Sequence, residues 1–217
     1  MKRLYVFAGV NGAGKSTFYV RQLEDDLLSA SVVASVAKII IYGLRINSDE
    51  LVREFGDWRN AKDQQRAARL ALRLRKNYLE NGVSFNIETT LSGHSIVNFI
   101  KDAKARGYFV TLFYVGLESV ELSKCRVAIR AAKNGHSING AVLERRYDAS
   151  FVNLARLIGV CDEIYFYDNS APIKNEDEQK FSNLALVAKK QDGCVMRISD
   201  KKYEWFERVM RKAETAC

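Results

Sequence analysis

The sequence predicts an α/β fold in three layers, with a mostly parallel sheet between helices. Short apolar runs alternate with segments of helical spacing along all 217 residues, which is typical of repeated βα units. The chain has a single proline, Pro172, and neither an internal repeat nor a low-complexity linker. Because one domain usually takes ~100–200 residues, we expect residues 1–217 to form a single domain.

The expected elements follow in order along the chain. A buried strand at 4–8 leads through a glycine-rich turn at 9–14 into a helix at 15–28. Apolar runs bounded by turn residues predict further strands at 38–46, 83–87, 108–115 and 163–167. Apolar residues at helical spacing predict helices at 60–81, 92–106, 120–133, 141–158 and 201–212. Two runs flanking Gln191-Asp192-Gly193, at 184–188 and 194–198, predict a hairpin.

The composition is that of an ordinary globular protein with an excess of positive charge. Hydrophobic residues make up 47% and charged residues 28% of the chain, which excludes wholesale disorder and a fibrous repeat. The formal net charge of +8 favours phosphorylated small molecules or polyanions as partners. A basic but inert surface is the alternative explanation.

The cysteines and the N-terminal segment indicate a cytoplasmic protein without a membrane segment. The four cysteines stand far apart, and two histidines do not complete a zinc site with them. Residues 1–10 are basic and then apolar, but they run into a glycine-rich turn without a cleavage site, so we interpret them as a strand. The apolar stretch at 31–44 contains Lys38 and is too short to span a bilayer.

The turn GVNGAGKST carries the most specific chemical signal. Gly9, four intervening residues, then Gly14, Lys15 and Ser16 form a P-loop between a strand and a helix, where its mechanism requires it. Glycines and a helix N-terminus bind phosphates there, Lys15 reaches the β- and γ-phosphates, and the Ser16 hydroxyl binds Mg²⁺. We therefore expect ATP and Mg²⁺ to bind at Gly9, Asn11, Gly12, Ala13, Gly14, Lys15, Ser16 and Thr17.

Three carboxylates follow expected strands, at the edge where open parallel sheets bind ligands. They are Asp49, Glu88 and Asp168. P-loop kinases use such acids to bind the acceptor, whereas switches and motors need a Walker-B carboxylate and a residue that positions water. Each acid could instead cap a helix or turn, Asp49 for a helix beginning at Glu50 and Glu88 for a later turn.

Basic residues on one expected helix suggest a lid. Arg126, Arg130 and Lys133 recur on one side of it, and guanidinium groups of a lid neutralise charge on a transferring phosphoryl group. We expect a helical lid at about residues 120–146, with Arg126 and Arg130 catalytic; a solvated basic face is the alternative. A second basic stripe, at positions 66, 69, 73 and 76, is interpreted as solvated surface.

Several segments, in this order, resemble the short stand-alone branch of the zeta-toxin family of P-loop kinases. They cover about residues 4–170 and are GVNGAGKST, INSD, IETTLSG, GYFVTLFYVG, RVAIR with NGH, LERRYDASFVNL and YDNS. The combination of INSD, ETTLSG and RVAIR…NGH is more specific than the P-loop alone. The resemblance implies the three-layer P-loop NTPase/kinase fold with a helical lid.

The resemblance also implies a reaction. Characterised zeta toxins transfer a phosphoryl group from ATP to a hydroxyl of UDP-N-acetylglucosamine, and an antitoxin protein is a candidate partner. By this resemblance Lys15 is the P-loop lysine, Asp49 activates the acceptor, and Glu88 and Thr89 bind it. Arg130 then matches the first lid arginine, with Arg126 beside it.

Two segments depart from the family pattern. His136 lies nearest to the position of the second lid arginine, in a shorter lid, and is expected on the substrate side. Residues 29–43 form an apolar insertion before INSD. The leading prediction is an ATP-dependent phosphotransferase acting on a small-molecule hydroxyl. A polynucleotide 5′-hydroxyl kinase, with nucleic acid as the less favoured partner, and an ATP-binding switch without turnover are the alternatives.

Overall fold

The computed structural model describes residues 1–21, 41–134, 138–171 and 184–215. The described strands are β1 (Arg3–Gly9), β2 (Leu44–Ile46), β3 (Phe85–Thr89), β4 (Phe109–Gly116), β5 (Glu163–Asp168), β6 (Ala185–Gln191) and β7 (Cys194–Arg197). They form one sheet in the order β2-β3-β1-β4-β5-β6-β7. β1 to β5 are parallel, and β6 and β7 complete the sheet in antiparallel pairing.

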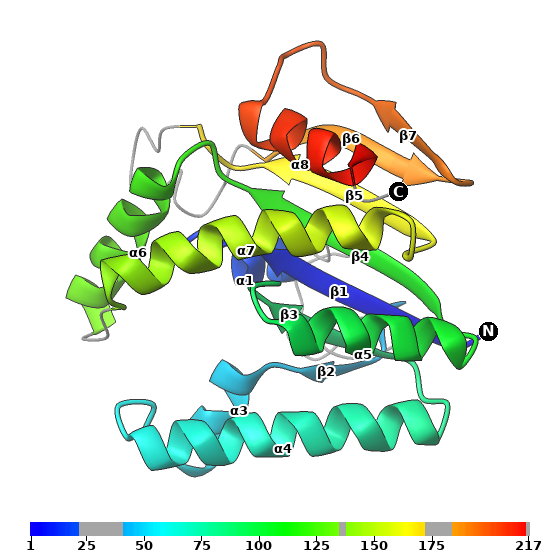
Figure 1. Ribbon diagram of the computed structural model, residues 1–217. Helices are drawn as coiled ribbons and strands as arrows, with labels where there is room; N and C mark the ends of the chain where they lie inside the picture. Colours follow the sequence, from blue (N-terminus) through cyan, green and yellow to red (C-terminus); the bar gives the residue numbers. More distant parts are fainter. Residues whose placement is uncertain (22–40, 135–137, 172–183, 216–217) are drawn as a thin grey trace.

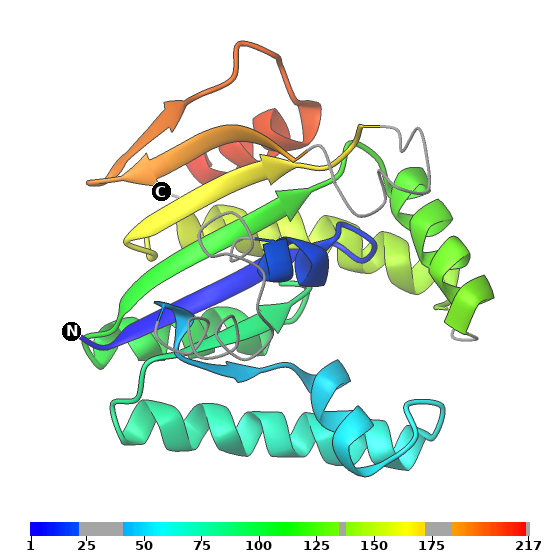
Figure 2. The same ribbon diagram turned by 180° about the vertical axis from the view of Figure 1, so that it is seen from behind.

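The described helices are α1 (Lys15–Arg21), α3 (Ser48–Phe55), α4 (Ala61–Glu80), α5 (His94–Ala105), α6 (Val120–Asn134), α7 (Gly140–Ile158) and α8 (Glu204–Glu214). α5, α7 and α8 lie in front of the sheet in Figure 1, and Figure 2 shows α1 on the opposite face. α3 and α4 lie beside the β2 edge, and α6 lies beyond the carboxyl ends of the strands (Figure 1). The prediction of a three-layer α/β fold with a mostly parallel sheet is confirmed.

Aromatic side chains fix α1 against the central strands. The rings of Phe7 and Phe113 stack at 5.1 Å between centroids, and Phe18 of α1 lies 5.8 Å from Phe113. All three side chains are buried. Burial of a phenylalanine stabilises the fold by about 1.5–3 kcal/mol, so this cluster anchors α1, and with it the turn that precedes α1, on the sheet.

The second strand is shorter than expected. β2 begins at Leu44 rather than at residue 38, because residues 41–42 are helical and Gly43 turns the chain with φ +69°. A Cβ at Gly43 would lie 2.2 Å from the Ser84 carbonyl oxygen, so the turn requires glycine. Residues 38–40 of that expected strand, and 22–28 of the first expected helix, lie outside the described residues.

The remaining elements agree with the predictions apart from their ends. β3 begins two residues later than expected, because the Val83 backbone N–H still bonds the Tyr78 carbonyl at the exit of α4. The hairpin of β6 and β7 is confirmed, with Asp192 and Gly193 at φ +52° and +80° in a two-residue turn. Among the helices that the structure describes, none is long and apolar enough to cross a bilayer.

Candidate active site

The glycine-rich turn lies between β1 and α1, at the edge where the parallel strands end. Gly9 pairs with Val115 of β4, and a Cβ at Gly9 would lie 2.2 Å from the Val115 carbonyl oxygen. Gly14 has φ +90°, and a Cβ there would lie 2.9 Å from the Asn169 side-chain amide. Both positions therefore require glycine, and side chains are kept out of a turn that must approach phosphates closely.

Side chains from two neighbouring elements hold the shape of this turn. The Ser123 hydroxyl of α6 donates to the Asn11 carbonyl at 2.7 Å. The Asn169 amide, which follows β5, donates to the Ala13 carbonyl at 2.9 Å. The side-chain oxygen of Asn11 is buried and has no hydrogen-bond partner within the described part of the chain. The turn is thus braced from α6 and β5, and Asn11 keeps one unused acceptor.

Lys15 is the first residue of α1, and its side chain is half-buried. Its ammonium donates to the Val10 carbonyl at 3.1 Å. Burial lowers the pKa of Lys15, the charge of Glu88 raises that pKa, the charge of Arg130 lowers it, and Asp49 raises it again. Glu88, Arg130 and Asp49, all three singled out from the sequence, are therefore the charged residues that act on the Lys15 ammonium.

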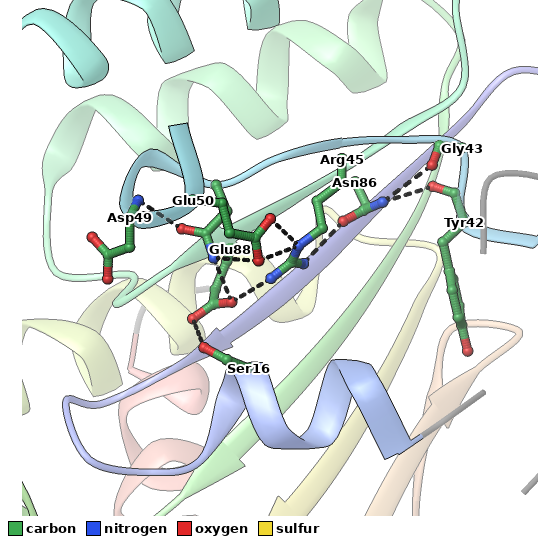
Figure 3. Close-up of polar contacts among 9 residues, drawn as sticks. Ser16, Tyr42, Gly43, Arg45, Asp49, Glu50, Asn86 and Glu88 are labelled. Atoms are coloured by element: carbon green, nitrogen blue, oxygen red, sulfur yellow. Dashed lines mark hydrogen bonds and ion pairs between the residues drawn. The ribbon is translucent and has the colours of Figure 1, made fainter. Parts of the chain in front are cut away.

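Glu88 lies in β3, opposite Phe7 of β1, and its carboxylate faces the P-loop helix. One oxygen, Oε1, accepts a hydrogen bond of 2.8 Å from the Ser16 hydroxyl. The other, Oε2, accepts from Arg45 at 2.7 Å and from Asn47 at 3.1 Å, as Figure 3 shows. The carboxylate therefore contacts the Ser16 hydroxyl at the start of the P-loop helix. Its expected contact with the acceptor stays a prediction.

Asp49 lies in the first turn of α3, which follows β2. The N-cap of α3 is Asn47, whose side-chain oxygen accepts from the Asp49 backbone N–H at 3.0 Å. The alternative that Asp49 caps this helix is therefore wrong. The helix begins at Ser48, and Asn47 occupies the capping position directly before Ser48. Asp49 is exposed, and its carboxylate points away from the Glu88 network in Figure 3. A capping role thus does not explain Asp49.

The two arginines expected in the lid lie one turn apart on α6 and have different surroundings. Arg126 is half-buried and donates to the Ala171 carbonyl at 3.2 Å. Burial lowers the pKa of Arg126, and the nearby Asp168 raises it. Arg130 is exposed and close enough to Lys15 to lower the pKa of Lys15. His136 lies outside the described residues.

Asp168 and Thr89 make local structural contacts. Asp168 is 4% exposed and accepts hydrogen bonds from the Ser170 backbone, the Ser170 hydroxyl and the Trp205 indole. It therefore ties the end of β5 to α8, in agreement with the turn-capping alternative. The Thr89 hydroxyl accepts from the Leu91 backbone N–H at 3.0 Å, and Leu91 has φ +57°. The hydroxyl of Thr89 thus stabilises the turn after β3.

Sequence reasoning did not single out five polar residues whose side chains make hydrogen bonds around the site, namely Arg45, Asn47, Asn86, Ser123 and Asn169. Asn86 stands two positions before Glu88, so the period of a strand places both on one face. Arg45 likewise stands two positions before Asn47, and Asn169 directly follows a strand-end acid. Asn47 and Asn169 also lie within the segments INSD and YDNS, which resemble the zeta-toxin family.

The donor set beside the P-loop suits Mg²⁺. Magnesium prefers oxygen ligands and is usually held by one or two protein groups together with substrate phosphates and water. The Ser16 hydroxyl and the Glu88 carboxylate supply such oxygens 2.8 Å apart. Within the described residues there is no group of three or more histidine, cysteine or acidic side chains that could hold a metal by themselves. The residues present therefore fit a metal that binds together with a nucleotide.

Solved structures of other proteins share this fold over most of the chain. A structure of AvrRxo1-ORF1:-ORF2 with ATP is similar with a TM-score of 0.65 at 16% identity, over 96% of this chain and 63% of that one. The chain thus spans less than two thirds of that protein. The PezAT toxin–antitoxin system of Streptococcus pneumoniae is similar with a TM-score of 0.54 at 15% identity, over 99% and 85%. A Pnkp1/Rnl/Hen1 RNA repair complex has a TM-score of 0.51 at 17% identity, over 71% and 46%.

These likenesses show the fold, and comparison of sequences shows the family. An uncharacterised protein of Haemophilus influenzae is 29% identical over 141 residues, which are 65% of this chain and 89% of that protein. The model of the zeta toxin family matches residues 1–183. Because this match spans most of the 217 residues, the chain belongs to the zeta-toxin family.

Proposed function

We propose that the chain is an ATP-dependent kinase that phosphorylates a hydroxyl of a small molecule, with a nucleotide sugar such as UDP-N-acetylglucosamine as the leading acceptor. The observation that carries this proposal is the hydrogen bond of 2.8 Å between Glu88 and Ser16, the residue that follows Lys15 in the P-loop. The charges of Asp49 and Arg130 also act on the Lys15 ammonium. A nucleotide-binding turn, a carboxylate beside its hydroxyl and a second, exposed carboxylate are the groups that phosphoryl transfer to an alcohol needs.

The strand order supports the placement of the two substrates. The P-loop follows β1, α3 follows β2, and α6 follows β4, while the sheet order is β2-β3-β1-β4. The P-loop therefore lies between α3, which carries Asp49, and α6, which carries Arg130. Open parallel sheets bind ligands in this crevice. ATP over the P-loop would then have the acceptor on the α3 side and the lid on the α6 side.

In the proposed reaction, the acceptor oxygen bonds to the γ-phosphorus and the bond to the bridging β–γ oxygen breaks, so that ADP leaves. Asp49 accepts the hydroxyl proton. Lys15 and Arg130 stabilise the negative charge on the transferring group, and Ser16 with Glu88 would hold the metal. A Mg²⁺ ion held there would supply positive charge that offsets the charge of the phosphates.

One observation favours a polynucleotide 5′-hydroxyl kinase as the second candidate. A shallow hollow of about 700 Å³ runs along the outer face of α4, lined by Lys62, Gln65, Arg66, Arg69, Leu72 and Arg73. Its arginines are exposed, and a row of such cations attracts a phosphate backbone. The Pnkp1 complex, an RNA repair assembly, shares the fold. Binding of this kind weakens steeply with salt, whereas a small-molecule kinase responds much less.

A protein partner is also proposed. The AvrRxo1-ORF1 structures contain a second protein, AvrRxo1-ORF2, and PezAT is a toxin–antitoxin system. Because these proteins share the fold of this chain, we propose that this chain also binds an antitoxin. Co-expression with the product of an adjacent reading frame, followed by co-purification, tests this proposal.

One screen tests the proposed function. ADP formation is measured with nucleotide sugars, small hydroxyl compounds, and RNA or DNA with 5′-hydroxyl ends, using Lys15→Ala as the matched control. Acceptor-dependent turnover with a nucleotide sugar supports the leading proposal. Turnover confined to nucleic-acid ends, and lost at high salt, supports the second candidate. ATP binding without acceptor-dependent turnover overturns both and favours a nucleotide-dependent switch.

A further inference from the structure

Arg45 of β2 connects four elements around Glu88. Its Nε contacts both carboxylate oxygens of Glu50 at 2.9 Å, and its two terminal nitrogens contact Asn86 at 3.2 Å and Glu88 at 2.7 Å. Its guanidinium also stacks 3.7 Å from the ring centre of Tyr19 in α1. Figure 3 shows the forked guanidinium of Arg45 pointing toward Glu88. One side chain thus joins β2, α3, β3 and the P-loop helix.

The Arg45–Glu88 pair is almost enclosed by protein. The side chains of Arg45 and Glu88 are 13% and 12% exposed. A carboxylate removed from water needs its charge satisfied, and a planar guanidinium satisfies it in one fixed direction. Arg45 engages Oε2, with Asn47 as a second donor, so Oε1 is the oxygen that faces Ser16. The direction of the Glu88 carboxylate is therefore set by Arg45.

We propose that Arg45 is a positioning residue for the Mg²⁺·ATP site and acts through Glu88. This inference rests on the proposed kinase function. Within the described residues, Arg45 reaches the P-loop helix through the ring of Tyr19 and through the carboxylate of Glu88, which bonds the Ser16 hydroxyl. Of these two contacts, the one with Glu88 leads to a group that would hold the metal, so we expect the Mg²⁺-dependent effect of Arg45 to pass through Glu88. Groups that orient the ligands of a metal typically contribute about 10–100-fold to metal affinity, and we expect Arg45 to fall in this range.

A purely structural role of Arg45 makes a different prediction. β2 is a three-residue edge strand, and the Arg45 contacts also tie it to β3. If that were their only role, loss of Arg45 would lower the melting temperature and leave the effect of Mg²⁺ on ATP binding unchanged. The readout that separates the roles is the Mg²⁺-dependent gain, defined as the ratio of ATP dissociation constants in EDTA and in saturating Mg²⁺.

The experiment measures this gain by calorimetry for the wild type, Arg45→Met, Glu88→Gln and the double variant. Methionine keeps an apolar stem against Tyr19 but removes the fork. We expect each single variant to lose about 10-fold of the gain while ATP affinity in EDTA stays within about twofold. Because Arg45 acts through Glu88, the double variant should be no worse than Glu88→Gln. Independent, multiplying losses would overturn the proposal.

Two further variants keep the test decisive. Arg197→Met removes another arginine–glutamate fork, with Glu207, far along the chain, and should leave the gain unchanged. Arg45→Lys keeps a cation without the fork, should recover part of the gain, and replaces Arg45→Met if that variant does not fold. An unchanged gain in a folded Arg45 variant, or no gain in the wild type, overturns the proposal. Binding without phosphoryl transfer to any acceptor would instead refute the proposed function and leave this inference standing.

Discussion

The Ser16 hydroxyl donates to the Glu88 carboxylate at 2.8 Å, between residues 72 positions apart in the sequence. Their separation is fixed by the sheet, because Glu88 is paired in register with Phe7 of β1, and β1 leads into the P-loop. The bond therefore joins the nucleotide turn to the neighbouring strand as one rigid unit. Phosphoryl transfer depends mainly on such positioning of groups before the reaction.

Lys15→Ala should abolish ATP turnover and leave the fold intact. The ammonium is the group expected on the phosphates, and within the described part of the chain it donates to the Val10 carbonyl at the turn. Alanine is favourable in a helix, so the free energy of unfolding should change by less than about 1 kcal/mol. Turnover and thermal unfolding are measured on the same preparation. A joint collapse of both would show that Lys15 has a structural role.

The phosphate-binding half of the site could be predicted from the sequence because its determinants are local. The strand, turn and helix of β1 and α1 are consecutive, and Gly9 and Gly14 are needed by the turn itself. The apolar periods of α4 and α7 similarly determine which face each helix buries. The P-loop turn and the buried faces of these helices depend on residues close together in the sequence, so the sequence alone predicts them.

The contacts around Glu88 and Asn11 depend on the order of the strands in the sheet, which the spacing of residues along the chain does not reveal. Arg45 meets Glu88 because β2 lies beside β3, and Ser123 reaches Asn11 because α6 packs over the turn. The sequence allows Asp49 as the N-cap of α3, but the structure has Asn47 there, two positions earlier. The Asn47 side chain accepts the hydrogen bond from the Asp49 backbone N–H. Both residue types are good caps, so only backbone geometry separates them.

Arg130→Ala should reduce turnover strongly and ATP affinity only modestly. Arg130 is exposed and near Lys15, where a guanidinium would act on charge that develops in the transition state. Comparable arginines contribute about 10³–10⁵ in rate. The control is Arg211→Ala, which removes an exposed arginine of α8, outside the expected lid. Turnover of the Arg130 variant within threefold of the wild type would assign Arg130 to the solvated surface.

Asp168→Asn should destabilise the fold. The buried carboxylate accepts three hydrogen bonds, and an amide would present N–H groups to the donors of Ser170 or Trp205. An unsatisfied buried polar group costs about 1–3 kcal/mol. Asp148→Asn is the matched control, because Asp148 is exposed and its ion pair among the described residues is a surface pair with Arg208. Urea unfolding of both variants measures the difference, and equal stabilities would contradict the structural role of Asp168.

Asp49→Asn and Glu88→Gln should separate proton transfer from metal binding. Asp49 is exposed and Asn47 makes the helix cap, so Asp49→Asn should leave stability within about 0.5 kcal/mol. Its turnover should fall by about 10²–10⁴, the usual contribution of a general base, with unchanged Mg²⁺·ATP affinity. Glu88→Gln keeps the shape of a group that contacts Ser16, and should weaken Mg²⁺·ATP binding. Saturation kinetics in ATP, Mg²⁺ and acceptor compare the two variants. Loss of kcat alone in Glu88→Gln, with Asp49→Asn fully active, would reverse the two roles.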